Sequence, residues 1–241
     1  MKQQNIVFVC VVVLIMPILM ASCSARDPLV DQLIDLEETE FPGQEISDRR
    51  IQELEQEIKK YREAVDAQVH ANGQLMVYYR MLGLRFLERQ MYGPAMEALE
   101  NALAITPANA NLHSYYATAA AYSAKARYES AEQDRLLQRA EQAYNRALEL
   151  APNHSNALYG LSVLLVFELH RPGDALVYLD RVLELQRNHF EARFVRAYAH
   201  AALGNIAEAV HDYDAIIETA RNAEMRREAT RLRSEVQGEI R

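Results

Sequence analysis

Large, small and aromatic residues recur at fixed offsets along the middle of the chain, and this internal repeat constrains the fold more than any other sequence feature. The clearest unit begins near residue 76 and reads Tyr79-x-x-Leu82-Gly83-x-x-Phe86, then Ala95-x-x-x-Leu99-x-x-Ala102, then Pro107. Small side chains at Gly83 and Ala95 would let two helices approach closely. Pro107 would end the second helix, because proline cannot continue one. A series of such units predicts stacked helix hairpins and an all-α chain.

Three further units follow with the same order of residue types. The fourth contains Ala197, then Leu203-Gly204-Asn205, then Ala209 and Tyr213. The third runs from about Ser155 to His189, and its turn at residues 171–174 is one residue longer than the repeat allows. The second runs from 110 to 152 and is longer than the others.

The second unit has a lengthened hairpin. The step from Ala117 to Ala140 is nearly twice as long as the equivalent step from Gly83 to Ala95. The excess is close to three helical turns and contains no glycine or proline, so the residues on each helix face stay in phase. The sequence predicts two lengthened helices that meet near Ser130, where Ser130 and Gln133 fit a capping box. A disordered loop is the alternative.

The pattern resembles the consensus of the tetratricopeptide repeat (TPR), with Tyr79 where the consensus has tryptophan and Arg221 where it has proline. The resemblance implies a TPR-type α-solenoid of antiparallel hairpins, with four TPR-like repeats over residues 73–221. Residues 222–241 are predicted to form a C-terminal capping helix. A solenoid needs such a helix, with a polar outer side, to cover its last repeat.

In TPR proteins the first helix of each repeat lines a concave surface, and the resemblance implies which residues would lie there. This candidate binding surface comprises Arg80, Leu84, Asn111, Tyr115, Tyr122, Asn156, Tyr159, Phe167, Phe194 and Tyr198. TPR domains that clamp a terminal carboxylate use lysines and asparagines at such positions. One arginine and no lysine argue against that clamp. The uncharged stretch from Ala157 to Phe167 must be covered, either by a partner or by another part of the chain.

Residues 47–72 are predicted to form an N-terminal helix that begins at Ser47 and ends near His70. Its apolar residues recur at three- and four-residue steps and give one stripe, formed by Ile51, Leu54, Ile58, Tyr61, Val65 and Val69. The stripe is predicted to pack against the first repeat. A coiled-coil seam is the alternative, although the pattern covers only about three heptads.

Residues 1–22 are predicted to be a signal peptide. Lys2 precedes an apolar run from Ile6 to Ala21, which is short for a membrane span. The run leads into Leu19-Met20-Ala21-Ser22-Cys23, which resembles the lipobox of bacterial lipoproteins, with Met20 in place of the usual leucine. The resemblance implies cleavage before Cys23 and its lipidation with acyl chains such as palmitate. An uncleaved signal anchor is the alternative.

The residues after Cys23 are predicted to form an acidic tether up to residue 46. In lipoproteins of two-membrane bacteria, an aspartate directly after the lipidated cysteine often means retention in the inner membrane. Ser24 stands there instead. The expected location is therefore the periplasmic side of the outer membrane.

Composition and motifs limit the function. The net charge of −8 argues against a nucleic-acid partner, because phosphate binding needs a basic face. The only two cysteines are Cys10 in the leader and Cys23, so disulfides cannot stabilise the body. The sequence has no phosphate loop, metalloprotease motif or thiol nucleophile, and its histidines are scattered. We therefore expect no enzymatic activity, no cofactor and no metal site.

Two binding functions remain. The first is a membrane-anchored adaptor that binds a protein partner in the periplasm, since lipid-anchored TPR proteins of this size resemble subunits of β-barrel and type IV pilus assembly systems. The second is a ligand-binding accessory lipoprotein of a periplasmic transport system, with a small apolar molecule in the aromatic groove. An open trough would favour the adaptor, and a deep closed pocket the accessory.

Overall fold

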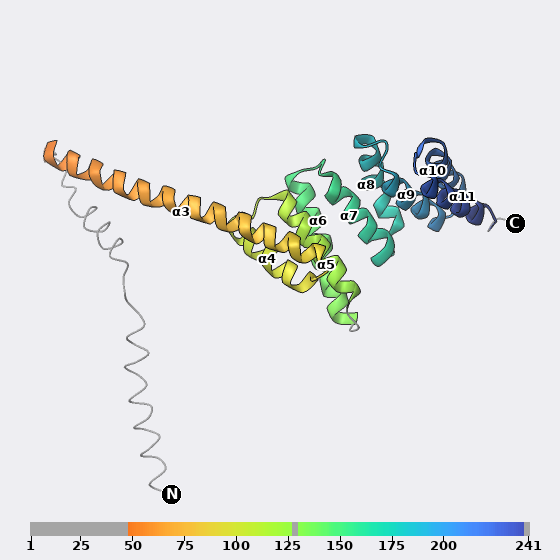
Figure 1. Ribbon diagram of the computed structural model, residues 1–241, viewed down its shortest axis with the longest axis horizontal. Coiled ribbons are helices and arrows are strands. Elements are labelled where there is room, and N and C mark those ends of the chain that lie inside the picture. The colour runs from red at the N-terminus through yellow and green to blue at the C-terminus, as the bar shows by residue number, and fades with distance from the viewer. Residues whose placement is uncertain (1–47, 127–129, 239–241) are drawn as a thin grey trace, which may run out of the picture. The chain divides into compact units, whose positions relative to one another are not determined.

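The structure is a computed structural model that describes residues 48–126 and 130–238, and it contains helices and no strand within those ranges. The leader, Cys23 and the acidic tether lie outside the described residues. The chain divides into two units, Met1–Glu63 and Ala64–Arg241. The helices are α3 (Asp48–Glu88), α4 (Tyr92–Ile105), α5 (Ala110–Lys125), α6 (Ser130–Leu150), α7 (Ser155–Val163), the π-helical turn η1 (Leu164–Glu168), α8 (Pro172–Leu185), α9 (Phe190–Ala202), α10 (Ile206–Thr219) and α11 (Ala223–Gly238) (Figure 1).

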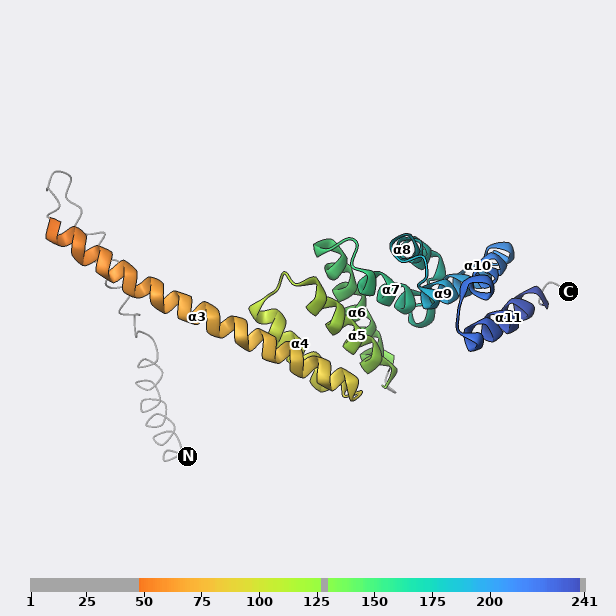
Figure 2. The same cartoon turned by 45° about the horizontal axis from the view of Figure 1, so that its top comes forward.

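Within the second unit, from α4 to α11, each helix packs against the next one in the sequence (Figure 2). The first helices of successive hairpins, α5, α7 and α9, also contact one another. This is the arrangement of an α-solenoid, in which each hairpin buries its apolar face against its neighbours. The all-α solenoid predicted from the repeats is confirmed.

The repeat has small residues at positions where a neighbouring helix packs closely. A Cβ atom added to Gly83 in α3 would lie 2.7 Å from Leu99 Cγ in α4, and Leu99 is fully buried. Gly160 in α7 is in closer contact still. A Cβ there would lie 2.5 Å from the Tyr144 hydroxyl oxygen of α6. The close approach inferred for Gly83 is therefore present, and the sequence analysis missed the equivalent role of Gly160.

The residues before α5, α7 and α9 are equivalent caps. Asn109 Oδ1 accepts a hydrogen bond from the Leu112 N–H at 3.2 Å. The Nδ1 atoms of His154 and His189 accept from the amides three residues ahead, also at 3.2 Å. Each contact satisfies one of the free donors at a helix N-terminus. The two histidines thus act as N-caps, a structural role.

The third repeat holds its additional residue inside the helix. The step from Ser162 to Ala175 is one residue longer than the equivalent step from Ala197 to Ala209. The Leu169 N–H donates to the Leu164 carbonyl at 3.0 Å, a step of five residues, so the insertion forms the π-helical turn η1. The prediction that the extra residue lies in the turn at 171–174 is wrong. A π-turn absorbs it without disturbing the packing of α8.

Helix α3 differs from the prediction at its C-terminal end. The sequence predicts an N-terminal helix that ends near His70 and a first repeat that begins at residue 73, but α3 runs without a break to Glu88. The single Gly73 costs a helix only about 1 kcal/mol, and no proline stands there to end it. Val65 and Val69 are 59% and 63% exposed, so the predicted packing of this part of the stripe against the first repeat is wrong.

The second repeat has a longer hairpin than the fourth. Its helices α5 and α6 have 16 and 21 residues, against 13 and 14 for α9 and α10. Helix α5 ends at Lys125 and Ser130 is the first residue of α6, and residues 127–129 lie outside the described residues.

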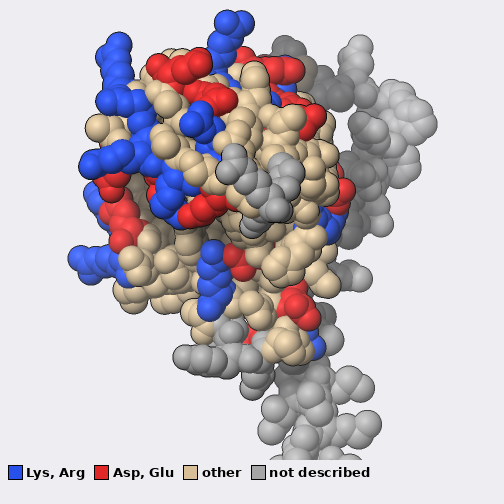
Figure 3. Space-filling model, turned by 90° about the vertical axis from the view of Figure 1, so that its right-hand side faces the viewer, with Lys and Arg blue, Asp and Glu red and all other residues tan. Residues whose placement is uncertain are grey.

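Helix α11 covers the end of the array. Its Ala229 is buried against a cluster that includes Tyr213 and Ile216 of α10. Charged side chains of both signs are interspersed on the face shown in Figure 3, which views the molecule from the side where α11 lies in Figure 1. No described helix is both long and apolar enough to cross a membrane.

Candidate binding groove

An apolar cavity opens between α5 and α7, over α6. Its volume is about 400 Å³. Four of the predicted surface residues line it: Tyr115 and Tyr122 from α5, and Asn156 and Tyr159 from α7. The complete lining is Ser114, Tyr115, Thr118, Ala121, Tyr122, Lys125, Tyr144, Asn156, Tyr159, Gly160, Val163, Leu164 and Glu168. We call this cavity, with the aromatic residues along its edge, the groove.

The floor of the groove is neutral and fixed in place. The Tyr144 ring lies against Gly160, where a side chain would otherwise collide with it. The Thr118 hydroxyl donates to the Ser114 carbonyl at 3.0 Å, which leaves its oxygen to accept the Tyr144 O–H at 3.0 Å. Burial raises the pKa of Tyr144 to about 12, because the phenolate would be poorly solvated there. The floor therefore carries no charge at physiological pH.

A row of aromatic residues crosses the edge of the groove. Tyr92 of α4 stacks on Tyr122 of α5, with ring centroids 5.1 Å apart and planes 13° apart. The ring centroids of Phe167 in η1 and Tyr198 in α9 are 5.0 Å apart. The Tyr122, Phe167 and Tyr198 side chains are 48%, 40% and 50% exposed. We call Tyr92, Tyr122, Phe167 and Tyr198 the aromatic row. Three of its four rings remain accessible to a partner.

One ion pair joins the two halves of the aromatic row. Lys125 Nζ lies 2.7 Å from Glu168 Oε1 and 5.8 Å from the Tyr122 ring centroid. The Glu168 side chain is only 15% exposed, so this pair is better shielded than a typical surface pair. The charges of the two groups cancel. The groove thus presents aromatic rings, hydroxyls and amides with no net charge.

The remaining predicted surface residues lie elsewhere. Asn111 accepts a hydrogen bond from His154 Nε2 at 2.9 Å, which links α5 to the cap of α7. Phe194 packs against the cluster that includes Tyr213 and Ala229, and its ring centroid lies 6.3 Å from that of Tyr213. Arg80 and Leu84 are half-buried on α3 and do not line the groove.

Several residues of the groove were not predicted from the sequence, among them Tyr92, Lys125 and Glu168. Tyr92 begins the second helix of its hairpin, whereas the TPR resemblance assigns the concave surface to first helices. Lys125 and Glu168 were missed because the lengthened α5 and the π-turn displace them from repeat positions. The one additional residue between Ser162 and Ala175 was the available signal, although it does not say where in that stretch the residue is absorbed.

Among the described residues no group of three or more histidine, cysteine, aspartate or glutamate side chains converges as metal ligands would. His154 and His189 are both engaged as caps. His200 and His211 line a hollow together with Arg196, Glu208 and Asp212, and Asp212 is already paired with Arg196.

Comparisons with known proteins agree with this geometry. No protein-family model matches the chain. A TPR repeat-containing protein of Borreliella burgdorferi is 25% identical over 157 residues, which are 65% of this chain and 68% of that protein. The crystal structure of a thermophilic TPR protein of Thermus thermophilus is similar, with a TM-score of 0.56, 16% identity, and coverage of 72% of this chain and 93% of that one.

A further solved structure is that of YrrB, described as a TPR protein with an unusual peptide-binding site. It has a TM-score of 0.50 and 21% identity, over 66% of this chain and 85% of that one. At these sequence identities the solved structures show similarity of fold and nothing further. Together with the hairpins and small-residue contacts above, the similarities show that the fold is a TPR-type α-solenoid.

Proposed function

We propose that the protein is a lipid-anchored TPR adaptor that binds a segment of a partner protein in the groove, as part of an assembly in the cell envelope. TPR proteins generally mediate protein–protein interaction, and YrrB is described as peptide-binding. The observation that carries the proposal is the exposed aromatic row beside a cavity of about 400 Å³. Exposed tyrosines and phenylalanines supply much of the binding energy at protein interfaces.

The anchoring part of the proposal rests on the sequence. The apolar leader and the Met20-Ala21-Ser22-Cys23 sequence support cleavage and lipidation at Cys23. The acidic residues 24–46 would then hold the solenoid away from an anionic membrane surface. In this arrangement the groove faces the periplasm.

A binding role without chemistry fits the lining of the groove. Its only charged side chains, Lys125 and Glu168, neutralise each other. The Tyr144 and Thr118 hydroxyls hydrogen-bond to each other, and the lining contains no histidine that could act as a base. Nucleophilic catalysis needs such an activating partner, and the one carboxylate of the lining is already paired with a lysine.

The second candidate function is an accessory of a transport system. The cavity volume of about 400 Å³ lies within the range of small-molecule pockets, and most of its lining is apolar. Tyr122, Tyr198 and Phe167 are each at least 40% exposed, which is more open than such pockets usually are. The exposure favours the adaptor.

Site-specific photo-crosslinking in intact cells tests the proposal. Benzoylphenylalanine replaces Tyr122 or Tyr198 in the row, and Tyr78 serves as the control because it is 66% exposed on α3, outside the groove. We expect a discrete crosslinked protein from positions 122 and 198 and none from 78. Absence of any crosslinked protein from 122 and 198, with a small apolar compound retained by the purified protein, would establish the accessory function instead.

A further inference from the structure

We infer that the groove binds an extended, proline-rich segment in the polyproline II conformation. This inference rests on the proposed function and names the chemistry of the partner. It depends on three properties of the groove: the spacing of the aromatic row, the kind of hydrogen-bonding groups beside it, and its lack of net charge.

The aromatic row runs across the helices. Its contacts lead from Tyr92 to Tyr122, through the Lys125–Glu168 pair to the neighbouring Phe167, and on to Tyr198. These residues belong in turn to α4, α5, η1 and α9. A segment that follows the row therefore crosses one helix after another and does not lie along a single helix.

The spacing of packed helices suits a polyproline II segment. Helices in contact have axes about 8–10 Å apart. Polyproline II has three residues per turn and a rise of about 3.1 Å per residue, so it repeats about every 9 Å. A segment that crosses the row can thus place an equivalent residue over each helix. Its proline rings would pack on the exposed faces of Tyr122, Phe167 and Tyr198, as proline-rich segments do in aromatic-lined grooves.

The polar groups beside the row also match. A proline-rich chain has carbonyl acceptors but almost no N–H donors, and polyproline II makes no internal hydrogen bonds. It therefore needs donors from its partner. Tyr115, Tyr122 and Tyr159 carry hydroxyls and Asn156 carries an amide in the groove lining. The carboxylate of Glu168, which would attract N–H donors, is occupied by Lys125.

The neutral groove argues against charged partners. A segment with several acidic residues would need an available cation, and Lys125 already pairs with Glu168 at 2.7 Å. A basic segment would compete with Lys125 for the same carboxylate. An uncharged proline-rich segment can bind without breaking the Lys125–Glu168 pair. Its binding should therefore depend little on ionic strength.

Fluorescence anisotropy with labelled peptides tests the inference. The full-length chain in detergent is titrated against a capped proline decamer and against a capped glycine–serine decamer of the same length and charge. We expect the proline peptide to bind at least about tenfold more tightly, and its Kd to change less than about twofold between roughly 50 and 500 mM salt, because electrostatic binding would be screened.

Matched tyrosine variants locate the binding. Tyr122→Ala and Tyr198→Ala should each weaken binding of the proline peptide about three- to tenfold, as expected for loss of one aromatic contact. Tyr78→Ala removes an even more exposed tyrosine outside the groove and should leave the Kd unchanged. Circular dichroism checks that all three variants keep their helix content.

Several results would overturn the inference. They are equal affinity for the two decamers, equal effects of the three tyrosine variants, and strong salt dependence. Photo-crosslinking in intact cells distinguishes failure of this inference from failure of the proposed function. If a protein crosslinks to position 122 or 198 but the proline decamer does not compete with it, the groove binds a partner of other chemistry. If nothing crosslinks there, the adaptor function itself is wrong.

Discussion

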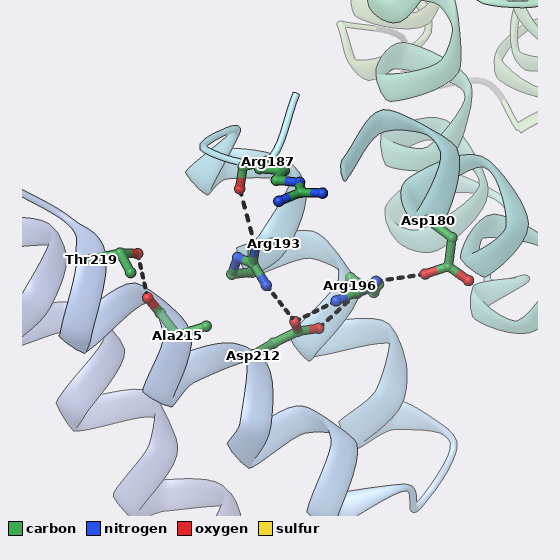
Figure 4. A network of polar contacts seen from close by, with 7 residues as sticks. All are labelled: Asp180, Arg187, Arg193, Arg196, Asp212, Ala215 and Thr219. Atoms are coloured by element: carbon green, nitrogen blue, oxygen red, sulfur yellow. Dashed lines mark hydrogen bonds and ion pairs between the residues drawn. The ribbon is translucent and has the colours of Figure 1, made fainter. Parts of the chain in front are cut away.

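The guanidinium of Arg196 in α9 holds the carboxylate of Asp212 in α10 through two hydrogen bonds, Nε to Oδ2 at 2.8 Å and Nη2 to Oδ1 at 2.6 Å (Figure 4). Asp212 is only 1% exposed. Arg193 adds a third contact at 3.3 Å, and Arg196 also reaches Asp180 of α8 at 2.6 Å. One arginine thus joins the third hairpin to the fourth through a buried and an exposed carboxylate.

This geometry predicts that Asp212→Ala destabilises the protein strongly. Removing Asp212 takes the buried partner from Arg193 and Arg196, and only the exposed Asp180 remains paired with Arg196. Breaking a buried ion pair in this way costs about 3 to 5 kcal/mol. Asp180→Ala is the matched control, because it removes the exposed partner of the same arginine and should cost less than about 1 kcal/mol. Urea unfolding followed by circular dichroism measures both. Similar losses for the two variants would show that burial of Asp212 contributes little.

Two glycines of α3 should respond in opposite ways to the same substitution. A Cβ at Gly83 would lie 2.7 Å from Leu99 Cγ, so Gly83→Ala overpacks the hairpin and should cost about 1 to 3 kcal/mol. Gly73 has no atom within 4 Å of an added Cβ. Gly73→Ala should therefore stabilise the helix by up to about 1 kcal/mol. Unfolding midpoints report both, and the prediction fails if the two changes have the same sign.

Much of the fold could be predicted because the repeat encodes local packing. Gly83, Ala95 and Ala102 are small, and Leu99 is large, for reasons of helix contact that any hairpin of this kind shares. The groove was predicted in part for the same reason. Tyr115, Tyr122, Asn156 and Tyr159 occupy equivalent faces of first helices and meet in one cavity.

The remaining features lie where the repeat pattern is interrupted or ends. The π-turn at Leu164–Glu168 places Phe167 beside Tyr198, and a periodic pattern cannot say where an inserted residue is absorbed. The Lys125–Glu168 pair joins residues that are far apart in the sequence and lie outside the repeat positions. Phe194 lies on a first helix but packs towards α11, because the array ends there.

The Cys23→Ala variant tests the anchor separately from the solenoid. The variant should lose labelling by a clickable palmitate analogue and pass into the soluble fraction, since no acyl chain would remain to bury. Its circular dichroism spectrum should match that of the parent protein, because Cys23 lies outside the repeats. If the variant still sediments with membranes and keeps residues 1–22, the segment is an uncleaved signal anchor.

Tyr144 predicts how stability changes at high pH. Its pKa is raised from 10.0 to about 12 by burial, so the folded state holds the phenolic proton more tightly than the unfolded state does. The resulting stability is fully present below about pH 10 and is lost as the pH rises from about 10 to about 12. A shift of about two pKa units corresponds to about 2 to 3 kcal/mol.

The Tyr144→Phe variant isolates this contribution. Phenylalanine keeps the ring against Gly160 but has no proton to lose, and it removes the O–H that donates to Thr118 Oγ1, while Thr118 keeps its bond to the Ser114 carbonyl. The variant should be about 1 kcal/mol less stable than the parent at neutral pH. Its free energy of unfolding should then fall less steeply above pH 10, although not to zero slope, because the other buried tyrosines Tyr116 and Tyr213, whose pKa values are also raised by burial, still titrate. Urea titrations of both proteins at neutral pH and at two points above pH 10 measure the difference in slope. Parallel pH profiles would mean that the Tyr144 phenolate is accommodated without loss, and that the floor of the groove is more open to water than its packing indicates.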